Sequence, residues 1–204
     1  MGQTNTGAYE RSSAAVGAVA IIALAGVSAY ALLAGRAGKV VGIGWVAFGA
    51  MALGTLLGVR ANGGTARGLV WGYGLASGAM VTSAAVFLVP QAIGYQPRFA
   101  GFGIAAGVLT GFAAHTVGHR LSHFDLLMDR TAAQITAHAV SAGAIIGAVY
   151  AAMPSLGPLL GLAIVSHKGP AGYAAARRLS LDGRPVTPLL LPAGALGAVA
   201  IAVS

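Results

Sequence analysis

The sequence predicts an all-α fold, a polytopic integral membrane bundle of about seven transmembrane helices. Of the 204 residues, 57% are hydrophobic and only 8% are charged, and the mean hydropathy is +0.81, which lies outside the range of soluble domains. A helix needs about 20 mainly apolar residues to cross the hydrocarbon core of a bilayer. The apolar runs lack the polar alternation of a barrel, so helices are the spanning structure that fits. Seven such runs follow one another, at about 13–34, 40–59, 68–94, 99–118, 132–152, 157–176 and 186–203.

The first run, 13–34, is predicted to be a retained helix. It is longer than the apolar core of a typical signal peptide, and "GAYERSS" precedes it. The stretch "AYALLAGRAGK" that closes it ends in charge and has no clear cleavage site. We therefore count it as the first span.

Short polar breaks separate the later runs and hold the arginines, most prolines and most carboxylates. Arg60 and Arg67 lie between the second and third runs, and the segment 119–131 separates the fourth from the fifth. The turn "AAMPSLGP" joins the fifth to the sixth. Because no linker is longer than about a dozen residues, residues 1–204 are expected to form a single membrane domain.

The basic residues between the runs predict an orientation. If the runs alternate in direction, one side of the membrane has far more arginine than the other. The positive-inside rule then places the N-terminus and the 119–131 segment in the cytoplasm, with the cell membrane as the expected location. The richer side receives Arg11, Arg60, Arg67, Arg120, Arg130, Arg177, Arg178 and Arg184, and the other side receives Arg36, Lys39 and Arg98.

Charge and composition also exclude several functions. The net charge of +8 is spread singly or in pairs between the spans, so membrane topology explains it better than a nucleic-acid partner. The chain has no cysteine and hence no disulfide and no thiolate metal site. No carboxylate lies in any span, which argues against intramembrane hydrolysis, and no nucleophile is placed beside a base. We do not expect an enzyme.

Glycine is frequent, at 32 residues, and much of it recurs at intervals of four. Gly103 and Gly107, Gly143 and Gly147, and Gly157 and Gly161 follow this small-xxx-small spacing, which lets helix backbones approach closely in lipid. The pattern predicts compact helix packing.

Polar groups at membrane depth are costly, so each is a candidate for a functional site. In the fifth run, Gln134, His138 and Ala142 succeed one another at steps of four and therefore share one helical face. In the sixth run, Ala171 lies one turn after His167. The strongly polar residues within the runs are Gln91, Gln134, His138, His167 and Lys168.

Two readings of the histidine pair are open. Each of His138 and His167 could be a neutral ring that is hydrogen-bonded to a neighbouring helix. Alternatively, because the two lie on adjacent antiparallel helices, both could face one central cavity. Pro170 favours the second reading, since a proline in a span frees a backbone carbonyl, and transport sites are often made at such interruptions.

A third cluster, "HTVGHRLSHFDLLMD", follows the fourth run. His115, His119 and His123 recur at steps of four, with Asp125 and Asp129 beyond them. On a continuous helix the three rings form a stripe at the cytoplasmic mouth that could bind Zn²⁺ transiently. A solvated helix end with scattered charge is the alternative, because the closed four-ligand spacing of a structural zinc site is missing.

At these residues the chain resembles the Zrt/Irt-like (ZIP) family of divalent metal transporters. Its fourth and fifth helices carry His-Asn-x-Pro-Glu-Gly and His-x-x-Pro-Glu-Gly, in which histidine and glutamate bind metal together. Here the two motifs read "HAVSAG" from His138 to Gly143 and "HKGPAG" from His167 to Gly172. Both histidines, both glycines and the second proline match, whereas both glutamates are alanine.

The resemblance covers roughly residues 40–203. "FLVPQA" at 87–92 resembles the second-helix motif His-Leu-Leu-Pro-Glu-Ala, with Gln91 in place of the glutamate. "MALGTLLG" resembles the first helix of the family and "AAGVLTGFAAHTVGHRLSH" the third. The run at 13–34 is then an extra leading helix, and the family's last two helices have no counterpart.

The resemblance implies transmembrane transport of Zn²⁺ or another divalent cation through a reduced site. Its candidate metal ligands are His138, His167, Gln134, Gln91, His115, His119 and His123. Without the glutamates, high-affinity zinc binding is not expected. No cofactor is expected to be tightly bound, since the cation is the substrate. The lipid bilayer is the expected surrounding, and a homodimer is left open. The alternative is a transport-inactive relative that serves as a structural or partner-binding subunit.

Overall fold

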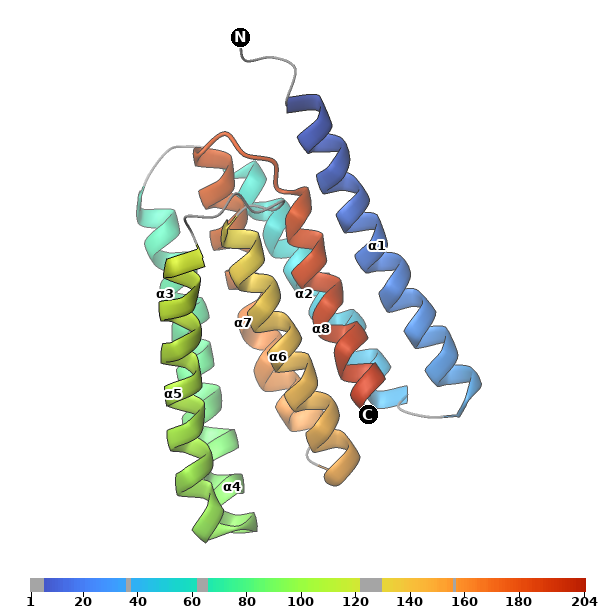
Figure 1. The fold of residues 1–204 in the computed structure, drawn as a ribbon, viewed down its shortest axis with the longest axis vertical. Helices are drawn as coiled ribbons and strands as arrows, with labels where there is room; N and C mark the ends of the chain where they lie inside the picture. The colour runs from blue at the N-terminus through green and yellow to red at the C-terminus, as the bar shows by residue number, and fades with distance from the viewer. Residues whose placement is uncertain (1–5, 36–37, 62–65, 122–129, 156) are drawn as a thin grey trace.

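The computed structural model describes residues 6–35, 38–61, 66–121, 130–155 and 157–204, and within these ranges the chain is all helical. Every predicted run lies in a helix, and the helices alternate in direction along the bundle (Figure 1). The third run is one rod made of three segments. The elements are α1 Thr6–Leu33, α2 Gly38–Arg60, α3 Ala66–Ser83, η1 Ala84–Leu88, α4 Val89–Tyr95, α5 Pro97–Leu121, α6 Arg130–Ala152, α7 Gly157–Leu181, η2 Thr187–Leu189 and α8 Leu190–Val203.

Four of the helices are long and apolar enough to cross a membrane. They are Ala14–Leu33, Gly38–Arg60, Arg67–Tyr95 and Thr131–Ala152. The outer faces of the bundle are apolar as well: Ile22, Trp71 and Phe102 are each at least 65% exposed. A soluble monomer does not present so much contiguous apolar surface. Length and surface together suggest an integral membrane protein.

The predicted spans 99–118, 157–176 and 186–203 are helices but are not among these four. α7 carries Lys168 and two arginines, which lower its mean hydropathy. The last apolar stretch, Thr187–Val203, has 17 residues and is therefore about 25 Å long at 1.5 Å per residue. It is shorter than the roughly 30 Å of hydrocarbon that a spanning helix must cross.

Glycines set the closest contacts of the core. α7 packs chiefly on α2 and α3, and α6 packs chiefly on α8. A Cβ on Gly143 or Gly147 would come within 2.6 Å of a backbone oxygen of α8, so this predicted small-residue pair does mark a helix contact. Gly161 lies as closely against Ile43 of α2.

α5 lies at the edge of the bundle and contacts chiefly α4 (Figure 1). The expected packing through Gly103 and Gly107 is wrong, because a Cβ at either position would meet nothing within 4 Å. The large side chains of this helix are exposed too, with Phe99, Phe102 and Phe112 at least 70% accessible. The spacing of glycines in a sequence does not show whether another helix packs against them.

The third rod contains one turn of π-helix, η1, just before Pro90. Proline has no N–H to donate and its ring collides with the carbonyl four residues earlier. The chain accommodates it by widening the turn, so that the Val89 N–H bonds to the Ala84 carbonyl, five residues back. The motif "FLVPQA" therefore runs across a change of helical register.

Candidate functional site

His138 and His167 lie side by side, one on α6 and one on α7. Their ring centroids are 5.9 Å apart, and the ring planes are inclined at 57°. The two helices run antiparallel, as the short turn between the two runs implies. Two histidines that are nearly 30 residues apart in the sequence therefore form one pair of neighbouring imidazole rings.

The two rings have different surroundings. His167 is only 5% exposed, and neither Nδ1 nor Nε2 has a hydrogen-bond partner within the described part of the chain. His138 is exposed at the surface of the bundle. A buried polar atom without a hydrogen-bond partner lowers stability by about 1 to 3 kcal/mol. A ligand bound to His167 would remove this penalty, and His138 is exposed to solvent or lipid, from which such a ligand could come.

The separation of the rings suits one shared ligand. A metal bound at about 2.1 Å from an imidazole nitrogen lies about 3 Å from the ring centroid, so two rings that share it have centroids roughly 5 to 6 Å apart. The observed 5.9 Å falls in this range. A single water molecule between the rings would fit the same spacing.

Among the residues that the structure describes, no acidic group joins the histidine pair. Ala142 and Ala171 occupy the two positions where the resembling family has glutamate, and Ala142 is a buried member of the apolar core. Lys168, 2% exposed, brings a positive charge within electrostatic reach of both rings. Among the described residues, no group of three or more His, Cys, Asp or Glu side chains could hold a metal ion.

The two glutamines lie in different places. Gln134 is exposed on α6, one turn before His138. Gln91 lines a cavity of about 450 Å³ that separates α4 and α5 from α6, together with Ile145 and Met153. This wall of α6 begins seven residues past His138, about 10 Å along the helix axis. The structure therefore keeps Gln134 near the pair and places Gln91 apart from it.

The third predicted cluster lies outside what the structure describes. His123 falls in the segment 122–129, and the side chains of His115 and His119, in the last turns of α5, are also outside the described set. The metal stripe at this helix end stays a prediction.

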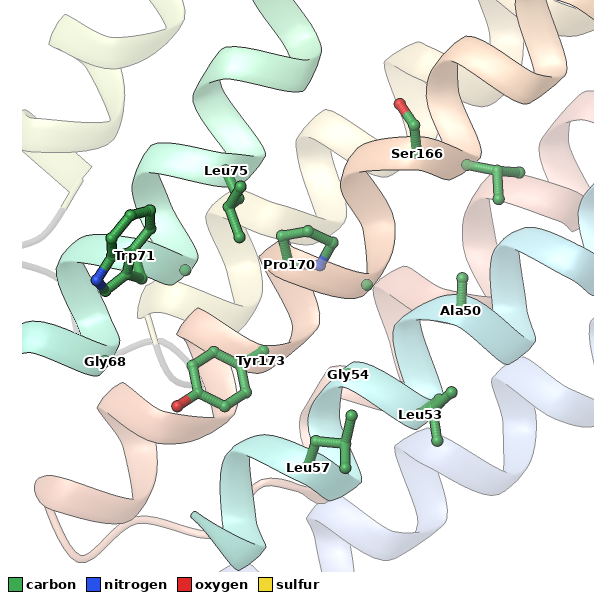
Figure 2. Close-up of a pocket in the computed structure, with 13 residues that line it drawn as sticks. Ala50, Leu53, Gly54, Leu57, Gly68, Trp71, Leu75, Ser166, Pro170 and Tyr173 are labelled. Atoms are coloured by element: carbon green, nitrogen blue, oxygen red, sulfur yellow. The ribbon is translucent and has the colours of Figure 1, made fainter. Parts of the chain in front are cut away.

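A second hollow, which the sequence did not reveal, lies between α2, α3 and α7. Its volume is about 620 Å³, and neither histidine lines it. Figure 2 shows Leu53 and Leu57 on one wall, Trp71 and Leu75 on the other, and Pro170 with Tyr173 between them. The sequence signal that could have indicated this region is glycine on all three helices, which marks the places where the helices approach closely beside the hollow. These are Gly54, Gly68, Gly72 and Gly169.

Compared with models of known protein families, with curated proteins and with solved structures, the chain gives no match. The functional argument therefore depends on the histidine pair and its surroundings.

Proposed function

We propose that this chain crosses the membrane seven times and carries a divalent cation, zinc or a similar metal, through a site made by His138 and His167. α5, α7 and α8 are then spans alongside the four longer apolar helices. In this proposal the N-terminus and the arginine-rich end of the bundle face the cytoplasm, and the protein resides in the cell membrane. The motifs "HAVSAG" and "HKGPAG" support a relation to ZIP transporters.

The observation that carries the proposal is that the buried ring of His167, whose nitrogens meet no hydrogen-bond partner in the described residues, lies beside His138 at a centroid distance of 5.9 Å. Both nitrogens of that ring are buried. Two neutral imidazoles bind a borderline dication weakly, and weak binding suits transport, because the ion must leave as well as enter. Lys168 would weaken binding further by repulsion.

Metal uptake into proteoliposomes tests this proposal. The purified chain is reconstituted, and entry of Zn²⁺, Cd²⁺ or Mn²⁺ is followed with an enclosed metal-sensitive dye against empty vesicles. Saturable uptake is expected for the natural chain and should disappear in the double variant His138→Ala/His167→Ala.

Ser141→Ala is the matched control. The Ser141 hydroxyl donates only to carbonyls of its own helix, those of Ala137 and His138, within the part of the chain that the structure describes. Its removal should leave uptake unchanged. Uptake that persists in the double histidine variant would refute the site.

A second candidate function is supported by the absence of the two glutamates that the ZIP motifs carry. With Ala142 and Ala171 in place of glutamate and Lys168 beside the rings, the chain could be a transport-inactive relative that acts as a structural or partner-binding subunit. Failure of every metal to enter vesicles, with a folded natural chain, would favour this candidate.

A further inference from the structure

The hollow between α2, α3 and α7 is lined almost entirely by apolar groups. The Ser166 hydroxyl, one of its few polar atoms, donates to the carbonyl of Ala163 in its own helix at 2.7 Å. Such a lining has little to offer water and favours an apolar occupant. At roughly 30 Å³ for a group the size of a water molecule, a volume of about 620 Å³ takes roughly 20 such groups, enough for an acyl chain.

The hollow opens outward along two of the membrane-length helices. Leu53, Leu57, Trp71 and Leu75 flank it and are each more than half exposed. Because α2 and α3 are apolar enough to span, the opening faces the hydrocarbon of the bilayer. Lipid chains are therefore the molecules available to enter it.

One end of the hollow lies beside a pair of arginines. Arg60 follows Leu57 by three residues at the end of α2, and Arg67 precedes Trp71 by four at the start of α3. Positions three or four apart are neighbours on a helix surface, so Arg60 and Arg67 each lie about one turn beyond a residue that lines the hollow, at the same end of it. Both side chains are exposed, and neither forms a hydrogen bond or ion pair with another described residue.

A third arginine, Arg177, lies one turn beyond Tyr173, which lines the hollow. Arg177 is 7% exposed, and its Nη1 donates to the Ala61 carbonyl at 2.5 Å, which ties α7 to the end of α2. Tyr173 lies one turn earlier, with its hydroxyl against Gly68. Tryptophan and tyrosine beneath basic side chains are typical of a membrane interface, where headgroups lie.

We propose that this hollow binds one anionic phospholipid, with an acyl chain between α2 and α3 on the surface of α7 and the phosphate at Arg60 and Arg67. The site depends on membrane insertion of α2 and α3 but not on metal transport, because α7 presents its histidine to α6 and its Gly169–Pro170 stretch to the hollow. Basic sites between helices are known to favour such headgroups. The choice of an anionic lipid follows from charge, because two guanidinium groups lie at the polar end and neither has an acidic partner among the described residues.

Native mass spectrometry of the full chain, released from micelles containing equal phosphatidylglycerol and phosphatidylcholine, tests the proposal. The natural chain should retain one phosphatidylglycerol in preference to phosphatidylcholine. Arg60→Gln/Arg67→Gln should reduce that preference about tenfold or more, since each basic group near the headgroup contributes about 1 kcal/mol. Arg98→Gln, at the opposite end of the bundle, is the charge control and should leave it unchanged.

A second pair of variants tests the apolar part of the site. Leu53→Trp places a large ring in the hollow and should abolish retention of the lipid. Leu56→Trp, also exposed on α2 but not part of the lining, should not. Excess inorganic phosphate should fail to displace the lipid. Equal retention of the two lipids, displacement by phosphate alone, or an equal effect of the two tryptophan variants would overturn the proposal.

Discussion

Gly54 of α2 lies directly against the carbonyl oxygen of Gly169 in α7, where the two backbones meet without a side chain between them. A Cβ added to Gly54 would collide with that oxygen. This contact belongs to the most extensively packed pair of helices among the described residues. It holds α7, and with it His167, at a fixed distance from α2.

Gly54→Ala is therefore expected to destabilise the folded chain by about 1 to 3 kcal/mol, the usual cost of forcing extra volume into a packed interface. Gly49→Ala, in the same helix, should be neutral or slightly stabilising, because its Cβ would meet nothing within 4 Å. Thermal unfolding in one detergent measures both. Equal melting temperatures for the two variants would show that α2 and α7 are not in this contact.

Arg177→Met and Arg178→Met should separate a buried arginine from an exposed one. Loss of the bond from Arg177 to the Ala61 carbonyl leaves a backbone acceptor unpaired, so a loss of about 1.5 to 3 kcal/mol in unfolding free energy is expected. Arg178 forms an exposed ion pair with Asp182 at 3.0 Å, and such pairs contribute less than about 1 kcal/mol. A larger loss for Arg178→Met, by chemical denaturation, would contradict the assignment.

His167→Leu distinguishes a ligand-binding ring from a packing ring. Since neither ring nitrogen of His167 has a partner within the described residues, an apolar side chain of similar size should keep or raise the melting temperature without metal. The same variant should abolish metal uptake. A strongly destabilised variant would mean that the imidazole is held by bonds that the folded chain needs.

Ala142→Glu/Ala171→Glu should restore the acidic half of both motifs. Two carboxylates in buried or half-buried positions should lower the melting temperature of the metal-free chain. Zinc, which binds only the folded form, should raise it again by mass action. The gain should vanish when His138 and His167 are also alanine. A zinc effect that survives that change would place the metal elsewhere.

The sequence predicted the helices well because membrane-length apolar runs are a strong signal. Their ends were less certain: α1 begins at Thr6 rather than 13, and α7 continues to Leu181, past the predicted 176. There Gly183, with φ +66°, ends the helix by accepting a left-handed conformation. Polar residues at a helix end hide its true length from a hydropathy scan.

The candidate site was predicted in part. The pairing of His138 with His167 followed from spacing and antiparallel helices. The position of Gln91 did not, because the sequence does not show that α4 packs against α5, where Gln91 lines a separate cavity. The hollow between α2, α3 and α7 was missed for a different reason. Glycines in the sequence indicate that helices pack closely, but only the folded structure shows where the packed helices leave a hollow.

The position of α5 has a mechanical consequence. Within the described residues this helix is held chiefly by α4, and the side chains of Phe102 and Phe112 are largely exposed. Because packing against neighbouring helices sets the tilt of a helix, the direction of α5 depends on its contact with α4 more than on the rest of the described bundle. The core helices meet at close glycine contacts, whereas among the described residues α5 is held chiefly at its junction with α4, so a change at that junction would redirect the whole helix.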